Sequence, residues 1–292
     1  EIGKVLSFAS SVRVAEAFAE KRLDGMELSI LYSKLPSAVK KTIVEPFVSI
    51  ENNEVRLSAR VLDSTPDLRR KDLLEKEKSF SRMRDEITQA RQALPWRKIS
   101  KSYEFETEDG VQSLAELFEG YGQLIIYHFM FEPQWEAGCK SCSLVADHYA
   151  PSVAHLKQRD VNLVTVSRAS LDKITGFKQR MGWDFKWVSS TQSDFNFDFY
   201  VSFTKEQIDN NKIYFNYSEG RTFPSTEIPA ISTFVKEPDG TIYHTYSGFS
   251  RGLENFMGVY TLLDLVPKGR DEDQLSYGME WVRLHDEYEH WA

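Results

Sequence analysis

The sequence has only two cysteines in 292 residues, and several other features are equally scarce. Two cysteines cannot form the disulfide framework that stabilises small secreted domains, so the fold must depend on a hydrophobic core. The chain has no apolar run long enough to cross a bilayer, which predicts no membrane span. Its net charge of −8 argues against a nucleic-acid partner.

The sequence also lacks a secretory signal peptide, and it begins at Glu1 rather than at methionine. We expect a cytoplasmic location, and an extracytoplasmic one stays open because the chain lacks its native start. Hydrophobic residues make up 41% and charged residues 27% of the chain, as is typical of a soluble globular protein. The length allows one large domain or two ordinary ones.

The two cysteines, Cys139 and Cys142, form a C-x-x-C motif behind an apolar, aromatic-rich run at 124–131. Such a run indicates a buried strand. A short turn-forming segment follows, which places Cys139 where a helix is expected to begin. Positions three apart are neighbours on a helix, so the two sulfurs can reach bonding distance.

This arrangement favours reversible dithiol chemistry. Unpaired N–H groups and the helix dipole stabilise a thiolate at a helix N-terminus, and Lys140 adds positive charge beside Cys139. The Cys139 thiolate would attack the disulfide of a partner, and Cys142 would resolve the mixed disulfide. The expected partner is a disulfide-containing protein or a low-molecular-weight thiol.

Two other interpretations of the cysteines stay open. Cysteine is often just a small buried hydrophobic residue. A metal site needs about four ligands, and His128, His148 and His155 lack tight ligand spacing. We therefore predict neither a metal nor a cofactor.

The sequence pattern divides the chain into three parts. Residues 1–65 read as a small α+β segment, 66–95 as one long linking helix, and 96–292 as an alternation of strands and helices. The elements expected in the first part are helices at 7–20 and 26–41 and strands at 44–50 and 55–61.

The long helix carries an apolar stripe with a period of seven residues: Leu73, Phe80, Ile87 and Leu94. Thr65 is suited to cap its N-terminus and Pro95 to end it. The stripe fits either a link between the flanking parts or the interface of a homodimer.

The third part has the element order of a thioredoxin-like domain. The strand at 124–131 and the helix after the cysteines are followed by strands at 161–166 and 228–235, a hairpin to 242–246, and a closing helix at 253–263. The predicted fold class is α/β, with a central mixed sheet flanked by helices. Pro229 would then lie beside the cysteines, in the cis form.

Residues 74–290 resemble a family of bacterial and fungal thioredoxin-like proteins that are described as predicted dithiol-disulfide oxidoreductases. The motifs that carry the resemblance are Tyr127–Phe131, Gly138–Ser143, Ala146–His148, Val166–Ala169, Met181–Trp183, Ser193–Asn196, Tyr243–Ser247 and Arg283–Tyr288. The resemblance implies a thioredoxin-like fold and a redox role for Cys139 and Cys142.

Residues 1–72 resemble part of the periplasmic porter region of RND-type membrane exporters. The motifs are Tyr32–Pro36, Val48–Asn53, Arg56–Val61 and Pro66–Arg70. The membrane helices of such exporters are absent from this sequence, so no transport function is expected. The segment suggests a fusion or a domain fragment.

Residues 110–131 also look like the entry to a peroxiredoxin domain. A peroxiredoxin would carry Thr or Ser three residues before its reactive cysteine and Pro seven before it. Here Glu136 takes the first position and Pro133 lies six before Cys139. A thiol peroxidase is therefore an alternative to the oxidoreductase, and a binding module with idle cysteines is another.

Four further residues are candidates for supporting roles at the site. Pro229 would line the groove that binds the partner, Trp135 would shape that groove or belong to the core, and Ser141 lies between the cysteines. Arg168 follows a predicted strand, and it would form either a structural ion pair with Asp194 or part of the site.

Overall fold

The computed structural model describes residues 22, 24–37, 40, 48–49, 54–55, 66–220 and 225–289. The chain divides into two units, residues 1–80 and 81–292. The helix predicted at 7–20 lies outside the described residues. No helix in the part of the chain that is described combines the length and the apolar character needed to span a membrane.

The first unit contains helix α2 (Gly25–Lys34), whose N-terminus is fixed by a capping box. The Asp24 carboxylate accepts hydrogen bonds from the main-chain N–H groups of Met26 and Glu27, and the Glu27 side chain accepts one from Asp24 N–H. The helix ends before Pro36, because the residue preceding a proline disfavours helical backbone. It is thus shorter than the predicted 26–41.

Strands β1 (Val48–Ser49) and β2 (Glu54–Val55) pair antiparallel, with Val48 opposite Val55. Helix α4 (Pro66–Gln92) follows, with Pro66 in its first turn and Asp67 at the positive end of its dipole. Its stripe residues Leu73, Phe80 and Ile87 are exposed.

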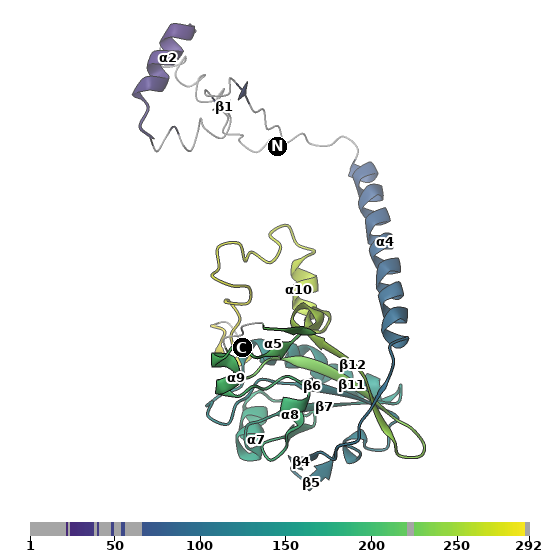
Figure 1. The fold of residues 1–292 in the computed structure, drawn as a ribbon. Coiled ribbons are helices and arrows are strands. Elements are labelled where there is room, and N and C mark those ends of the chain that lie inside the picture. Colours follow the sequence, from purple (N-terminus) through teal and green to yellow (C-terminus); the bar gives the residue numbers. More distant parts are fainter. Residues whose placement is uncertain are drawn as a thin grey trace. The chain divides into compact units, whose positions relative to one another are not determined.

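An eight-stranded mixed sheet forms the centre of the second unit, in the order β3-β12-β11-β6-β7-β8-β4-β5 (Figure 1). The strands are β3 (Arg97–Lys98), β4 (Glu104–Thr107), β5 (Gly110–Ser113), β6 (Gln123–His128), β7 (Val161–Ser167), β8 (Trp187–Ser189), β11 (Ala230–Lys236) and β12 (Ile242–Phe249). β6 runs parallel to β7, whereas β11 is antiparallel to both β6 and β12. This topology confirms the predicted α/β, thioredoxin-like fold class.

Two buried clusters cover the two faces of the sheet, because side chains on a strand alternate between faces. On β6, Tyr127 belongs to one cluster, and Leu124 and Ile126 belong to the other. The first cluster is covered by α5 (Lys140–Tyr149), α7 (Leu171–Arg180) and α10 (Gly258–Leu263). The second is covered by a 3₁₀ turn, η2 (Glu116–Phe118), and by α8 (Phe195–Asp198).

The remaining elements lie along the outside of this core. They are η3 (Ala150–Ser152), α6 (Val153–Lys157), α9 (Lys205–Asp209), the paired strands β9 (Tyr214–Phe215) and β10 (Ser218–Glu219), η4 (Ser250–Phe256) and η5 (His285–Glu287). Two of them still contribute buried side chains, Leu253 of η4 and Phe215 of β9. The interruption between α5 and α6 coincides with Pro151, which lies in η3 and has no main-chain N–H to continue the helix.

Three sequence predictions need correction. The pattern at 114–118, after Ser113, also predicts a short helix, but the structure has only the 3₁₀ turn η2 there, preceded by the unpredicted strand β5. The closing helix is divided into η4 and α10 at Gly258, where an added Cβ would lie 3.1 Å from the His148 ring and where His148 Nε2 accepts the N–H of Val259. The predicted cis form of Pro229 is also wrong, since the peptide bonds of the described residues are trans.

Candidate functional site: the dithiol at the start of α5

Cys139 occupies the N-cap position of α5, after a loop that leaves the end of β6. Its N–H donates to the Met130 carbonyl over 3.1 Å, and its own carbonyl accepts the N–H of Ser143. Gly138 is needed here, because an added Cβ would lie 2.7 Å from the Phe129 ring and 2.8 Å from the Phe177 ring. The backbone before Cys139 therefore packs directly on two aromatic rings.

Two lysines fix the surroundings of the dithiol through main-chain oxygens. Lys173 of α7 donates from Nζ to the carbonyls of Pro133 and Trp135, each over 2.9 Å. Lys140 donates from Nζ to the Glu280 carbonyl over 3.1 Å, which joins the C-terminal segment to α5. Nothing in the sequence marks Lys173 as part of the site, because it lies more than thirty residues from the loop that it contacts.

The two thiols are free and differ strongly in exposure: Cys139 is partly exposed, and Cys142 is 1% exposed. The pKa of Cys139 is lowered, first by a hydrogen bond from the Cys142 thiol, then by the main-chain N–H groups of Cys142 and Ser141 and by the charge of Lys140. Burial raises the pKa of Cys142 well above its usual value. The pair is thus divided into one thiol that ionises readily and one that stays protonated.

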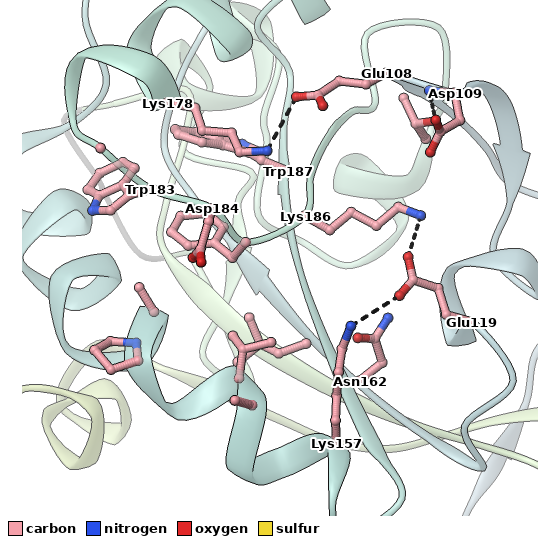
Figure 2. A pocket seen from close by; sticks show the side chains of 18 residues that line it. Glu108, Asp109, Glu119, Lys157, Asn162, Lys178, Trp183, Asp184, Lys186 and Trp187 are labelled. Atoms are coloured by element: carbon pink, nitrogen blue, oxygen red, sulfur yellow. Dashed lines mark hydrogen bonds and ion pairs between the residues drawn. The ribbon is translucent and has the colours of Figure 1, made fainter.

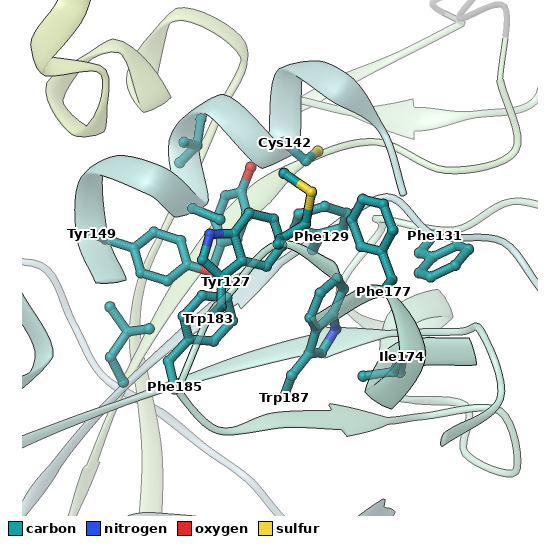
Figure 3. Packing of buried hydrophobic residues seen from close by; sticks show 14 of the residues in the cluster. Tyr127, Phe129, Phe131, Cys142, Tyr149, Ile174, Phe177, Trp183, Phe185 and Trp187 are labelled. Atoms are coloured by element: carbon teal, nitrogen blue, oxygen red, sulfur yellow. The ribbon is translucent and has the colours of Figure 1, made fainter. Parts of the chain in front are cut away.

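An aromatic cluster surrounds Cys142 and keeps water away from it (Figure 3). Phe129 packs on Trp187 with ring centroids 4.5 Å apart, and Phe131 packs on Phe177 at 5.6 Å. Trp135 is partly buried against the same cluster. It therefore both packs on the core and carries one of the carbonyls that fix the loop.

Pro229 lies at the same end of the central strands as the loop that carries the dithiol. It immediately precedes β11, and Ala230 pairs with His128, the last residue of β6. Among the predicted site residues, Cys139, Lys140, Ser141 and Cys142 thus share one helix start, and Pro229 stands on the strand next to β6.

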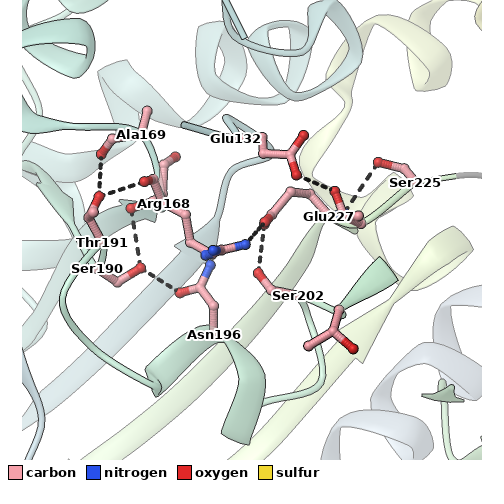
Figure 4. A network of polar contacts seen from close by, with 12 residues as sticks. Glu132, Arg168, Ala169, Ser190, Thr191, Asn196, Ser202, Ser225 and Glu227 are labelled. Atoms are coloured by element: carbon pink, nitrogen blue, oxygen red, sulfur yellow. Dashed lines mark hydrogen bonds and ion pairs between the residues drawn. The ribbon is translucent and has the colours of Figure 1, made fainter. Parts of the chain in front are cut away.

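Arg168 follows β7 and forms a buried polar network rather than the predicted pair with Asp194 (Figure 4). Its guanidinium binds the Glu227 carboxylate over 2.9 Å, and Ser202 donates to the other carboxylate oxygen over 2.7 Å. Asp194 instead pairs with Lys101. Burial raises the pKa of Glu227 to about 7 despite the two partners.

The network adjoins the loop that carries the dithiol. Thr226, next to Glu227, donates to the Glu132 carboxylate over 2.6 Å, and Glu132 lies on that loop. The sequence gives no sign that Glu227 is buried, because one sequence cannot separate a buried acid from an exposed one. Residues 226–227, shortly before β11, therefore contact both Arg168 and the loop that carries the dithiol.

A cavity of about 800 Å³ lies away from the dithiol, and none of its described lining residues is a cysteine (Figure 2). Its lysines are paired with acids: Lys186 binds Glu119 over 2.7 Å, and Lys178 binds Glu108 over 3.3 Å. Among the described residues, no group of three or more His, Cys, Asp or Glu could hold a metal ion.

A comparison with protein families places the chain in one of them. A family model described as bacterial protein of unknown function (DUF899) matches residues 64–288. The chain belongs to this family. The DUF899 match begins at residue 64, so the resemblance of residues 1–72 to RND-type exporters stays a prediction. No curated protein matches the sequence.

Solved structures similar to this DUF899 chain include peroxidoxin BcpB from Mycobacterium tuberculosis, at 13% identity and a TM-score of 0.38, over 56% of this chain and 94% of that one. Peroxiredoxin Q from Xanthomonas campestris has 14% identity and a TM-score of 0.37, over 58% and 96%. A putative thiol:disulfide interchange protein DsbE from Chlorobium tepidum has 12% identity and a TM-score of 0.34, over 57% and 98%.

Proposed function

We propose that the protein is a thiol-disulfide oxidoreductase, with Cys139 as the attacking thiolate and Cys142 as the resolving thiol. The observation that carries the proposal is the asymmetry of the pair. Cys139 is partly exposed at a helix N-terminus with a lowered pKa, and Cys142 is buried three residues later with a raised one. Because Cys139 is accessible, its thiolate attacks the substrate disulfide first. Cys142 is shielded, so it can react only with the mixed disulfide already formed at Cys139.

The reaction proceeds in two exchanges. The Cys139 thiolate forms a bond to one sulfur of a disulfide RSSR′, and R′S⁻ leaves. The Cys142 sulfur then bonds to the Cys139 sulfur, RS⁻ leaves, and the proton of Cys142 passes to it. The protein dithiol loses two electrons to the substrate disulfide, and the reverse sequence oxidises a partner dithiol.

We expect the partner to approach the end of the sheet where β6 leads into the dithiol loop and Pro229 precedes β11. A disulfide-containing protein or a low-molecular-weight disulfide would reach Cys139 there, because Cys139 is partly exposed whereas Cys142 is buried. The homodimer predicted from the sequence is a separate proposal, which rests on the exposed stripe of α4.

Peroxide is a less suitable substrate than a disulfide. The residue three positions before Cys139 is Glu136, whose side chain is 95% exposed and carries a carboxylate. A carboxylate accepts hydrogen bonds but cannot donate one to a peroxide oxygen. The disulfide reaction needs no such donor.

Alkylation of the reduced protein tests the proposal. With iodoacetamide and mass spectrometry at each cysteine, we expect Cys139 to react as a thiol with a pKa well below the free value of about 8.5. Cys142 should be protected at every pH that keeps the protein folded. Slow reaction of both cysteines with unshifted pKa values would contradict the oxidoreductase and favour the binding module.

Two variants complete this test. Cys139→Ser should abolish turnover of a small disulfide such as oxidised glutathione. Cys142→Ser should retain the first exchange and accumulate the mixed disulfide at Cys139. Retention of partner binding without any turnover in the wild-type protein would support the binding module.

A further inference from the structure

The second exchange of the proposed reaction poses a physical problem that the dithiol alone does not solve. Cys142 must act as a thiolate, yet it is 1% exposed and lies in an aromatic cluster. An ionised group in such a site is costly unless hydrogen-bond donors compensate for the lost water. Two donors lie next to this sulfur.

The first donor is the main-chain N–H of Met130, directed at the Cys142 Sγ over 3.5 Å. Met130 lies just beyond β6, and its carbonyl holds the N–H of Cys139. The same residue therefore contacts both halves of the dithiol. Because this donor belongs to the backbone, it is fixed in place before any reaction.

The second donor is the hydroxyl of Tyr127 on β6. Tyr127 is 1% exposed, and its hydroxyl has no hydrogen-bond partner among the described residues. Burial raises the pKa of both groups, but the nearby Tyr127 hydroxyl acts in the opposite direction on Cys142 and lowers the pKa of that thiol, so donation by Tyr127 would favour the Cys142 thiolate. Tyr127 and Cys142 lie in one cluster (Figure 3).

An unpaired buried hydroxyl destabilises a folded protein, whereas phenylalanine would fill the same space without a polar atom. Tyr149 packs beside Tyr127, with ring centroids 5.3 Å apart, and its hydroxyl is paired with Thr165 Oγ1 at 2.6 Å. In the resting protein the Tyr149 hydroxyl is hydrogen-bonded, whereas the Tyr127 hydroxyl is unpaired among the described residues.

We propose that Tyr127 is a positioning residue whose hydroxyl, together with the Met130 N–H, holds the Cys142 sulfur as it becomes the attacking thiolate. The inference rests on the proposed oxidoreductase function. The Tyr127 hydroxyl donates only when charge develops on the sulfur, so it lowers the barrier of the second exchange and leaves the first unchanged. Attack by Cys139 does not involve the hydroxyl.

Stopped-flow reaction with one equivalent of 5,5′-dithiobis(2-nitrobenzoate) separates the two exchanges. The first nitrothiobenzoate leaves when Cys139 attacks, and the second leaves when Cys142 resolves the mixed disulfide. Tyr127→Phe should slow the second release by about tenfold or more, as expected for the loss of a hydrogen bond to a charged sulfur. The first release should stay within about twofold.

Tyr149→Phe is the matched control, because it removes a buried hydroxyl from the same cluster but not one beside the sulfur. It should leave both releases at the wild-type rates. Equal slowing by both variants, or an unchanged second release in Tyr127→Phe, would overturn the role of Tyr127 while leaving the oxidoreductase intact. A wild-type protein that releases no second equivalent would instead refute the oxidoreductase itself.

Discussion

Glu227 is the residue whose charge state most directly couples this fold to pH. Its carboxyl is 2% exposed, and burial raises its pKa to about 7, above the value of about 4.3 for an unfolded chain. Between these values the folded protein holds a proton that the unfolded chain releases. Stability therefore decreases as pH rises through this window.

We predict that the free energy of unfolding of the wild-type protein falls by about 2 kcal/mol from pH 5 to pH 8, relative to Glu227→Gln. Urea unfolding of both proteins at the two pH values measures this. The comparison with Glu227→Gln cancels the pH dependence that other groups contribute to stability. One such group is His128, whose pKa is lowered by burial to about 3. The exposed substitution Glu104→Gln should keep the wild-type slope, and equal slopes in all three proteins would refute the prediction.

At the level of single residues, the sequence could indicate Cys139 and Cys142, because their spacing is itself the signal. It could not indicate Tyr127 or Glu227. A tyrosine in an apolar strand and an acid two residues before a proline have no special local pattern, and their roles depend on which groups the fold places beside them. Arg168 was a predicted candidate, but its partner is Glu227 rather than Asp194.

At the level of elements, the loop before α5 has no space for a larger residue at Gly138. An added methyl group would approach two aromatic rings closer than 3 Å. We predict that Gly138→Ala lowers the free energy of unfolding by about 1–3 kcal/mol, as overpacking does, and slows alkylation of Cys139 by moving its backbone. Thermal or urea unfolding and the alkylation rate measure the two effects.

Gly176 provides the control for this substitution. It lies in α7, where an added Cβ would meet nothing within 4 Å. Gly176→Ala should raise the free energy of unfolding by about 0.5–1 kcal/mol through helix propensity, with no change at Cys139. If Gly138→Ala is as stable and as reactive as the wild type, the Phe129 and Phe177 rings move aside at little cost, and the prediction is refuted.

The elements that the sequence predicted well are long and have one dominant pattern. β6 and β7 are rich in leucine, isoleucine and valine and largely buried, as central parallel strands are. The sequence missed β5, since Gly110–Ser113 is short and mostly exposed. It also could not show the division of the closing helix, which depends on His148 from a distant helix.

At the level of the whole molecule, the stripe of α4 predicts self-association. Leu73, Phe80 and Ile87 are 55%, 70% and 50% exposed, at the seven-residue period of a helix–helix seam. We predict that the wild-type protein sediments as a dimer and that Phe80→Glu sediments as a monomer. Analytical ultracentrifugation over a range of concentrations distinguishes the two.

Lys71→Glu is the control, because this exposed residue lies on another face of the same helix. It reverses a charge near the seam without entering it, so the dimer should persist. A wild-type protein that sediments as a monomer would contradict the predicted dimer. The sequence could predict this helix from its repeat and its flanking prolines, but not what covers its apolar side.

The manner in which the loop at 129–138 is held also matters for protein engineering. Lys173 holds the loop through the carbonyls of Pro133 and Trp135. Lys140, at the start of α5, donates to the carbonyl of Glu280 in the C-terminal segment. Every residue type supplies such a carbonyl. The exposed side chains of Gln134 and Glu136 can therefore be exchanged to alter the substrate preference of Cys139, while the anchors that set the shape of the loop remain.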